Sequence, residues 1–237
     1  AIVDFRFLAL GVAIGALVGA LLALKVRMTG MPELVALFNG FGGAASVLVA
    51  GAAFLEVVDA GTVDDQLAVA AAVTVLIGAV TFTGSMVAFG KLRESLRWNG
   101  FSGLHIVRAA TGAVALILVV GVVVQPDSLG WFWGLAAAGL LLGVLATIAI
   151  GGADMPVVIA LLNAFSGVAA STTGFVLDNP LLIIAGSLVG ASGLILTQIM
   201  CTAMNRSSST WCSRRPWSSP GAPTTTPTAT ASIASTK

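Results

Sequence analysis

Seven apolar runs, each about 20 residues or longer, fill most of residues 1–206 of the chain. A helix needs roughly 20 apolar residues to cross the hydrocarbon core of a membrane. The runs do not alternate with period two, which excludes a membrane β-barrel. The sequence therefore predicts an all-α fold, a polytopic transmembrane helix bundle of about seven helices. The predicted spans are residues 5–25, 33–55, 66–90, 104–124, 129–150, 155–177 and 181–203.

The composition agrees with a membrane domain. Of the 237 residues, 57% are hydrophobic and only 9% are charged, whereas soluble proteins carry about 25% charged residues. The mean hydropathy is +1.03. The net charge of +1 argues against nucleic acid as a partner, and the sequence predicts no metal site.

Charged residues alternate in sign from one end of the predicted spans to the other. The basic residues follow the first, third and last spans and are Lys25, Arg27, Lys91, Arg93, Arg97, Arg206, Arg214 and Arg215. The acidic loops contain Glu56, Asp59, Asp64, Asp65, Asp127 and Asp178, with no basic residue. Because loops rich in Lys and Arg stay in the cytoplasm, we expect the amino terminus outside and the carboxyl terminus inside. Cys201 and Cys212 then lie where thiols stay reduced, and the sequence assigns no disulfide.

Two segments repeat one arrangement. MPELVALFNGFGG at 31–43 and MPVVIALLNAFSG at 155–167 each place proline second, asparagine ninth and glycine last. Both copies enter the membrane from the same predicted side, so the repeat is parallel. Proline costs no hydrogen bond in the first turn of a helix, which predicts that each copy begins a helix.

An acidic residue accompanies each of these prolines, Glu33 in the first copy and Asp154 in the second. A carboxylate is favoured at the positive end of a helix, and capping alone would account for both residues. Two glycines precede Asp154 in GGAD, so its charge could instead turn toward a channel mouth or a docked domain. The sequence leaves both interpretations open.

Asn39 and Asn163 lie seven residues past the two prolines, which places their amides about 10 Å inside the membrane. A lipid-facing amide is costly at that depth, so both side chains are predicted to face the interior of the bundle. They either join helices by hydrogen bonds, worth about 0.6 kcal/mol each, or line a polar, hydrated pathway.

Hydroxyl groups and glycines recur in several spans. Thr81, Thr83, Ser85 and Ser192 either bond to carbonyls of their own helices or, with the two asparagines, hold a chain of waters. Glycines four residues apart predict faces where another helix backbone comes close. These are Gly11, Gly15 and Gly19, Gly139 with Gly143, and Gly186 with Gly190.

Four segments, on four predicted helices and in the same order, resemble the membrane domain of the β subunit of proton-translocating nicotinamide nucleotide transhydrogenase. They are MPELVALFNGFGG, IGAVTFTGSMVAFGKL, GGADMPVVIALLNAFSG and GSLVGASGLILTQIMCTAMNRS, and the likeness covers residues 7–206. It implies a proton channel in a bacterial-type inner membrane, coupled to hydride transfer between NADH and NADP+. Asp154, Asn163, Asn39 and the segment 190–193 match the family's functional positions.

The resemblance also implies cofactors and partners. In that family NAD(H) binds to a soluble domain of the α subunit, and NADP(H) binds to a soluble domain at the β carboxyl terminus. It implies no cofactor site in this chain, but NAD and NADP in the complete enzyme. The implied partners are the α subunit, the NADP(H)-binding domain, membrane lipid and a second αβ unit in a homodimer. Asp154 and Arg206 are expected at the cytoplasmic surface, where the NADP(H) domain docks.

The chain departs from the family pattern in three places. Some members have a membrane histidine near the start of the span at 66–90, whereas the single histidine here is His105, expected at an exposed interface. Members with an asparagine at the position of Asn39 have the proton-carrying histidine on the α subunit. Further helices precede residues 5–25 in the family, so the chain is expected to begin part-way through that domain. Residues 207–237 are Ser/Thr/Pro-rich, are predicted to be disordered, and are expected to be a frameshifted or vector-derived end.

Two other functions remain open on the sequence alone. A small secondary transporter typically shows internal repeats and helices interrupted by Pro and Gly, and a membrane assembly subunit needs no site at all. A retinal-binding pump is excluded, because it needs a lysine in its last span, and the lysines here are Lys25, Lys91 and Lys237.

Overall fold

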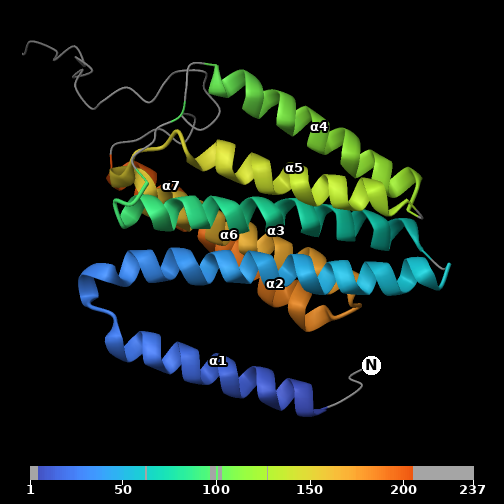
Figure 1. The fold of residues 1–237 in the computed structure, drawn as a ribbon, viewed down its shortest axis with the longest axis horizontal. Coiled ribbons are helices and arrows are strands. Elements are labelled where there is room, and N and C mark those ends of the chain that lie inside the picture. The colour runs from blue at the N-terminus through green and yellow to red at the C-terminus, as the bar shows by residue number, and fades with distance from the viewer. Residues whose placement is uncertain (1–4, 62, 97–99, 101–102, 127, 205–237) are drawn as a thin grey trace, which may run out of the picture.

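In the part of the chain that the structure describes, the fold is a bundle of seven α-helices, drawn in Figure 1. The computed structural model describes residues 5–61, 63–96, 100, 103–126 and 128–204. The α-helices are α1 (Phe5–Lys25), α2 (Met31–Asp59), α3 (Asp65–Leu92), α4 (Leu104–Val124), α5 (Leu129–Thr147), α6 (Met155–Val176) and α7 (Pro180–Ala203). Short 3-10 helices, η1 (Met28–Gly30) and η2 (Gly152–Asp154), precede α2 and α6. All seven α-helices are long and apolar enough to cross a membrane, which confirms the predicted fold class. Arg206 and the tail at 207–237 lie outside the described residues.

The predicted spans differ from the helices by only a few residues at each end. The span expected to end at 55 continues to Asp59 in α2, because helix geometry can continue into the polar surface layer of the membrane. The span expected to end at 150 stops at Thr147, where the chain turns through Gly151 into η2. Both predicted proline starts are confirmed, since Pro32 and Pro156 lie in the first turns of α2 and α6.

Successive helices run in opposite directions, so their ends form two opposite faces of the bundle (Figure 1). We call the end that contains Lys25, Lys91 and Arg93 the basic end, and the opposite end, with Asp59 and Asp65, the acidic end. At the basic end, Arg93 Nε lies 3.8 Å from Glu33 Oε2. This ion pair joins the start of α2 to the end of α3, and the Arg93 guanidinium also lies over the ring of Phe89, 5.6 Å from its centroid.

Helix α3 is the central helix of the bundle and packs against α2, α4, α5 and α6. In its most apolar 18-residue stretch 56% of the residues are buried, whereas in that of α1 none is buried. Small side chains cover its buried surface, so neighbouring backbones come close to it. The buried alanines of α3 are Ala68, Ala70, Ala71, Ala72, Ala79 and Ala88.

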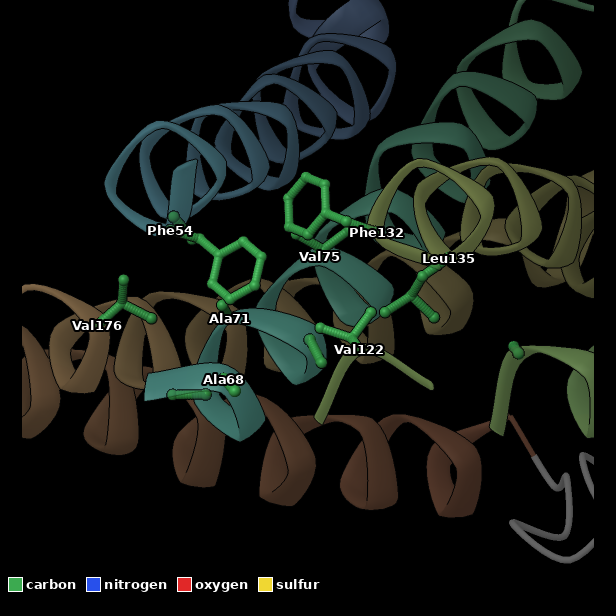
Figure 2. Packing of buried hydrophobic residues seen from close by; sticks show 12 residues of the cluster. Phe54, Ala68, Ala71, Val75, Val122, Phe132, Leu135 and Val176 are labelled. Carbon is green, nitrogen blue, oxygen red and sulfur yellow. The ribbon is translucent and has the colours of Figure 1, made fainter. Parts of the chain in front are cut away.

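An apolar cluster closes the half of the bundle toward the acidic end (Figure 2). Phe54 of α2 and Phe132 of α5 stack with ring centroids 5.2 Å apart and planes inclined by 13°. Val75 of α3 and Val122 of α4 belong to the same cluster. Val176 adds α6 to the cluster. Because lipid tails are as apolar as these side chains, close packing rather than the hydrophobic effect holds the five helices together here.

The closest packing of helix backbones is between α6 and α7. A Cβ added to Gly167 would lie 2.8 Å from Gly190 Cα and 2.9 Å from the carbonyl oxygen of Gly186. Helix α5 approaches α3 in the same way, because a Cβ on Gly139 would lie 3.2 Å from a main-chain oxygen of α3. The close approaches predicted for the glycines of α5 and α7 are therefore confirmed.

Helix α1 packs differently from the other six. None of its residues is buried, and no atom lies within 4 Å of the Cβ positions of Gly11, Gly15 and Gly19. Within the described residues, the prediction that these glycines meet another helix backbone is wrong. The physical reason is that η1 joins α1 to the bundle at one end only, and α1 lies apart from α2 along its length (Figure 1).

Candidate functional site

Three polar side chains meet between α2, α3 and α6, and we call them the polar node: Asn39, Ser85 and Ser166. Asn39 Nδ2 donates a hydrogen bond to Ser85 Oγ at 2.9 Å. Ser166 Oγ donates to Asn39 Oδ1 at 2.7 Å. Asn39 is 9% exposed and Ser85 is fully buried, so the predicted interior position of Asn39 is confirmed. The node therefore links three helices through one amide.

Close packing of the helices explains how one short amide side chain reaches hydroxyl groups on two neighbouring helices. A Cβ on Gly43 would lie 2.8 Å from the carbonyl oxygen of Gly78, so the backbones of α2 and α3 are in contact next to the node. Asn39 lies eight residues into α2, and Ser85 lies seven residues before the end of α3. Both positions correspond to a depth of about 10–12 Å from the basic end. The node therefore lies inside the membrane-spanning part of the bundle.

Asn163, the second asparagine of the repeat, is not part of the node. Its side chain is exposed on α6, so the prediction that it faces the interior of this chain's bundle is wrong. On the helical wheel Asn163 points between Ser166, which contacts α2, and Gly167, which contacts α7. Both helices pack on α6, but the described residues show no packed interface between α2 and α7. Asn163 is exposed because α2 and α7 do not close over it.

Of the four predicted hydroxyl groups, only that of Ser85 joins the node. Thr81 Oγ1 donates to the Ile77 carbonyl at 2.7 Å in its own helix. Thr83 Oγ1 lies 3.1 Å from the Ala79 carbonyl of α3 and 2.8 Å from a carbonyl of α5, so it faces α5 instead. Ser192 is exposed and donates to the Val189 carbonyl at 3.1 Å. These three hydroxyls follow the common pattern of bonding to backbone carbonyls.

The two acidic residues of the repeat differ in their surroundings. Glu33 is partly exposed in its ion pair with Arg93. Asp154 is only 4% exposed, which corrects the expectation that it lies at the surface. It occupies the N-cap position of α6 but makes no capping hydrogen bond. It does have another interaction partner. Its burial follows from η2, which packs against the end of α3, where a Cβ on Gly152 would lie 3.7 Å from the Lys91 carbonyl oxygen.

Two further polar residues were not singled out from the sequence as site residues. In the second copy of the repeat, Ser166 stands where the first copy has Gly42. This difference is the only indication of Ser166 that the repeat offers. Lys91 is 6% exposed, and its Nζ donates to the Ile148 carbonyl at 2.5 Å and to the Ile150 carbonyl at 2.6 Å. The signal for Lys91 was a lysine inside the last turn of an apolar helix.

Neither His105 nor Cys201 belongs to the polar node. His105 is exposed at the start of α4, as expected. Cys201 is a buried free thiol, and Cys212 lies outside the described residues. Within the part of the chain that the structure describes, no cluster of three or more His, Cys, Asp or Glu side chains could hold a metal ion.

The fold and the node define a multi-pass helical membrane protein with a polar core inside its bundle. The family model of the NAD(P) transhydrogenase beta subunit matches residues 1–213. Two curated relatives named NAD(P) transhydrogenase subunit beta, both from Rhodospirillum rubrum and one from a defined strain, are 43% identical over 210 residues. The aligned part is 86% of this chain but 45% of each relative, so the chain spans less than half of their length. The chain belongs to the NAD(P) transhydrogenase beta subunit family.

Proposed function

We propose that this chain forms the proton-conducting membrane domain of a proton-translocating NAD(P) transhydrogenase. In this proposal proton movement is coupled to hydride transfer between NADH and NADP+, which bind to separate soluble domains. The polar node carries the proposal, because a buried amide hydrogen-bonded to two serines lies between three spanning helices. Family membership supports the enzyme complex. We place the basic end in the cytoplasm by its lysines and arginines.

The chemistry of the node limits what it can do. Amide and hydroxyl groups both donate and accept hydrogen bonds, so they can hold and orient water molecules. They do not change charge at physiological pH, so they are not themselves proton carriers. His105, the single histidine of the sequence, is exposed at the start of α4. We therefore infer that a titratable group of the proton pathway comes from the α subunit.

The exposed amide of Asn163 indicates where that subunit would pack. An amide facing lipid about 10 Å inside the membrane is costly. Asn163 faces the open side of α6 between α2 and α7. We propose that a membrane helix of the α subunit covers this side and supplies a polar partner, so that Asn163 lines the pathway between the subunits.

Asn163→Leu is expected to lower coupled turnover of the complete complex about tenfold or more, equivalent to about 1.4 kcal/mol of barrier. The fold of this chain should not change, because the side chain is exposed on α6. Hydride transfer between the nucleotides measures coupled turnover. Co-purification of the α subunit measures whether the complex still assembles. Val189→Leu, a change between apolar residues at another exposed position, is the control. Wild-type turnover in Asn163→Leu would show that this amide has no part in the pathway.

Asp154→Asn separates charge from capping, because asparagine caps a helix about as well as aspartate. The carboxylate makes no capping bond in the structure. We propose that its charge takes part in coupling, so we expect coupled turnover to fall about tenfold or more, with the melting temperature lowered by only a few degrees. Asp65→Asn, at the acidic end, is the control. A large loss of melting temperature with normal turnover per folded complex would mean that Asp154 is structural.

Reconstitution in vesicles tests the proposed function. The chain is assembled with its α subunit and NADP(H)-binding domain, and a pH-sensitive dye reports the vesicle interior. We expect a pH change only when both nucleotides are supplied. Solute transport that needs no nucleotide domain would favour a secondary transporter. Normal hydride transfer without any pH change would leave the chain as an assembly subunit.

A further inference from the structure

We propose that Lys91 is a positioning residue, which holds the segment 148–154 and thereby fixes Asp154 relative to the polar node. The functional part of this inference rests on the proposed role of Asp154 in coupling. The geometric part, that Lys91 holds the segment 148–154, does not depend on that role. The two parts are therefore tested by separate measurements.

The ammonium group of Lys91 lies at the point where α5 ends. It donates to the carbonyls of Ile148 and Ile150, 2.5 and 2.6 Å away. The last carbonyls of a helix have no partner within the helix, and they form the negative end of its dipole. A cation there satisfies both the hydrogen bonds and the charge. Lys91 of α3 thus fixes the end of α5 and the turn that follows it.

The same helix carries one member of the polar node. Ser85 precedes Lys91 by six residues on α3, which is about 9 Å along the helix axis. Asp154 follows Ile150 by only four positions, and the last three of these, Gly152–Asp154, form η2. Helix α3 therefore connects the node to the Asp154 segment as one rigid element, with Lys91 as the contact at its end.

Packing alone does not account for a lysine at this position. Lys91 is 6% exposed, and burying a charged group is costly unless it is paired and hydrogen-bonded. A methionine of similar length would fill the space without that cost. The charge and its hydrogen bonds therefore contribute what an apolar side chain cannot, namely a fixed position for the carbonyls of Ile148 and Ile150. The segment held in this way leads directly to Asp154.

A buried thiol tests the geometric part. Met155, directly after Asp154, is fully buried, so Met155→Cys in a full chain without Cys201 and Cys212 should react slowly with a water-soluble maleimide. Adding Lys91→Met should raise the labelling rate about tenfold or more, because local opening exposes the thiol. Lys25→Met, at an exposed helix end, should change it less than about twofold. Unchanged labelling with Lys91→Met would overturn the proposal.

A double-mutant cycle tests the functional part in the complete complex. Lys91→Met and Asp154→Asn should each lower coupled turnover about tenfold, and the double variant should be no slower than the single ones. A multiplicative loss of about a hundredfold would overturn the proposal, because it would mean independent roles. If Lys91→Met does not assemble, Lys91→Leu, which also removes the charge and the donors, takes its place with the same outcomes. A labelling response in a complex that never moves protons would contradict the proposed function and leave the positioning role intact.

Discussion

Replacing Asn39 with leucine is expected to reduce proton-coupled turnover by about a hundredfold, or about 2.7 kcal/mol of barrier. The substitution removes the amide that joins Ser85 and Ser166. It leaves both hydroxyls without that partner and puts an apolar side chain where water would have to sit. Hydrogen bonds between membrane helices are worth only about 0.6 kcal/mol each on average. The bundle should therefore still assemble.

Thr83→Val provides the matched control for Asn39→Leu. Thr83 is on the same central helix as Ser85, but its hydroxyl faces carbonyls of α3 and α5 and not the node. Turnover with Thr83→Val should stay within about threefold of wild type, because the substitution removes only one weak hydrogen bond. Equal losses in the two variants would mean that turnover depends on helix packing and not on the node.

Gly167→Ala is expected to destabilise the bundle by about 3 kcal/mol or more. The added Cβ would lie 2.8 Å from Gly190 Cα and 2.9 Å from the Gly186 carbonyl oxygen. These are backbone atoms of α7, which cannot rotate away as a side chain can. Helices α6 and α7 would have to separate, and this would also displace Ser166 from Asn39. Thermal unfolding in detergent measures the loss.

Gly15→Ala on α1 is the control, because no atom lies within 4 Å of its Cβ position. Its effect on unfolding of the isolated chain should be below about 0.5 kcal/mol. Alanine has the higher helix propensity, so propensity alone would stabilise both variants slightly. A similar loss in both variants would contradict the prediction, because the loss would then not depend on the contact between α6 and α7.

The fold could be predicted from the sequence, because a spanning helix depends on a property of one segment. Run length and apolar content determine whether a segment can cross the membrane, and Pro32 and Pro156 mark two of the helix starts. The interior position of Asn39 was predicted by depth alone. The same argument failed for Asn163, because depth does not specify which side of a helix its neighbours cover.

The contacts of the site depend on how the helices are rotated and packed, which the sequence does not specify. Ser166 reaches Asn39 because α6 turns that face toward α2. Asp154 is buried because η2 packs against the end of α3. Lys91 illustrates a further limit. The rule that assigns orientation counts a lysine near a helix end as part of a loop, whereas this one is buried and bonds two carbonyls.

The most direct test of the central claim is to record hydride transfer and internal pH in the same vesicles. The vesicles contain the chain assembled with its α subunit and NADP(H)-binding domain, with either Asn39 or Asn39→Leu. If the polar node lies on the coupled proton pathway, both signals should fall together, by about a hundredfold, in the variant. A variant that transfers hydride and moves protons at the wild-type rates would contradict the claim.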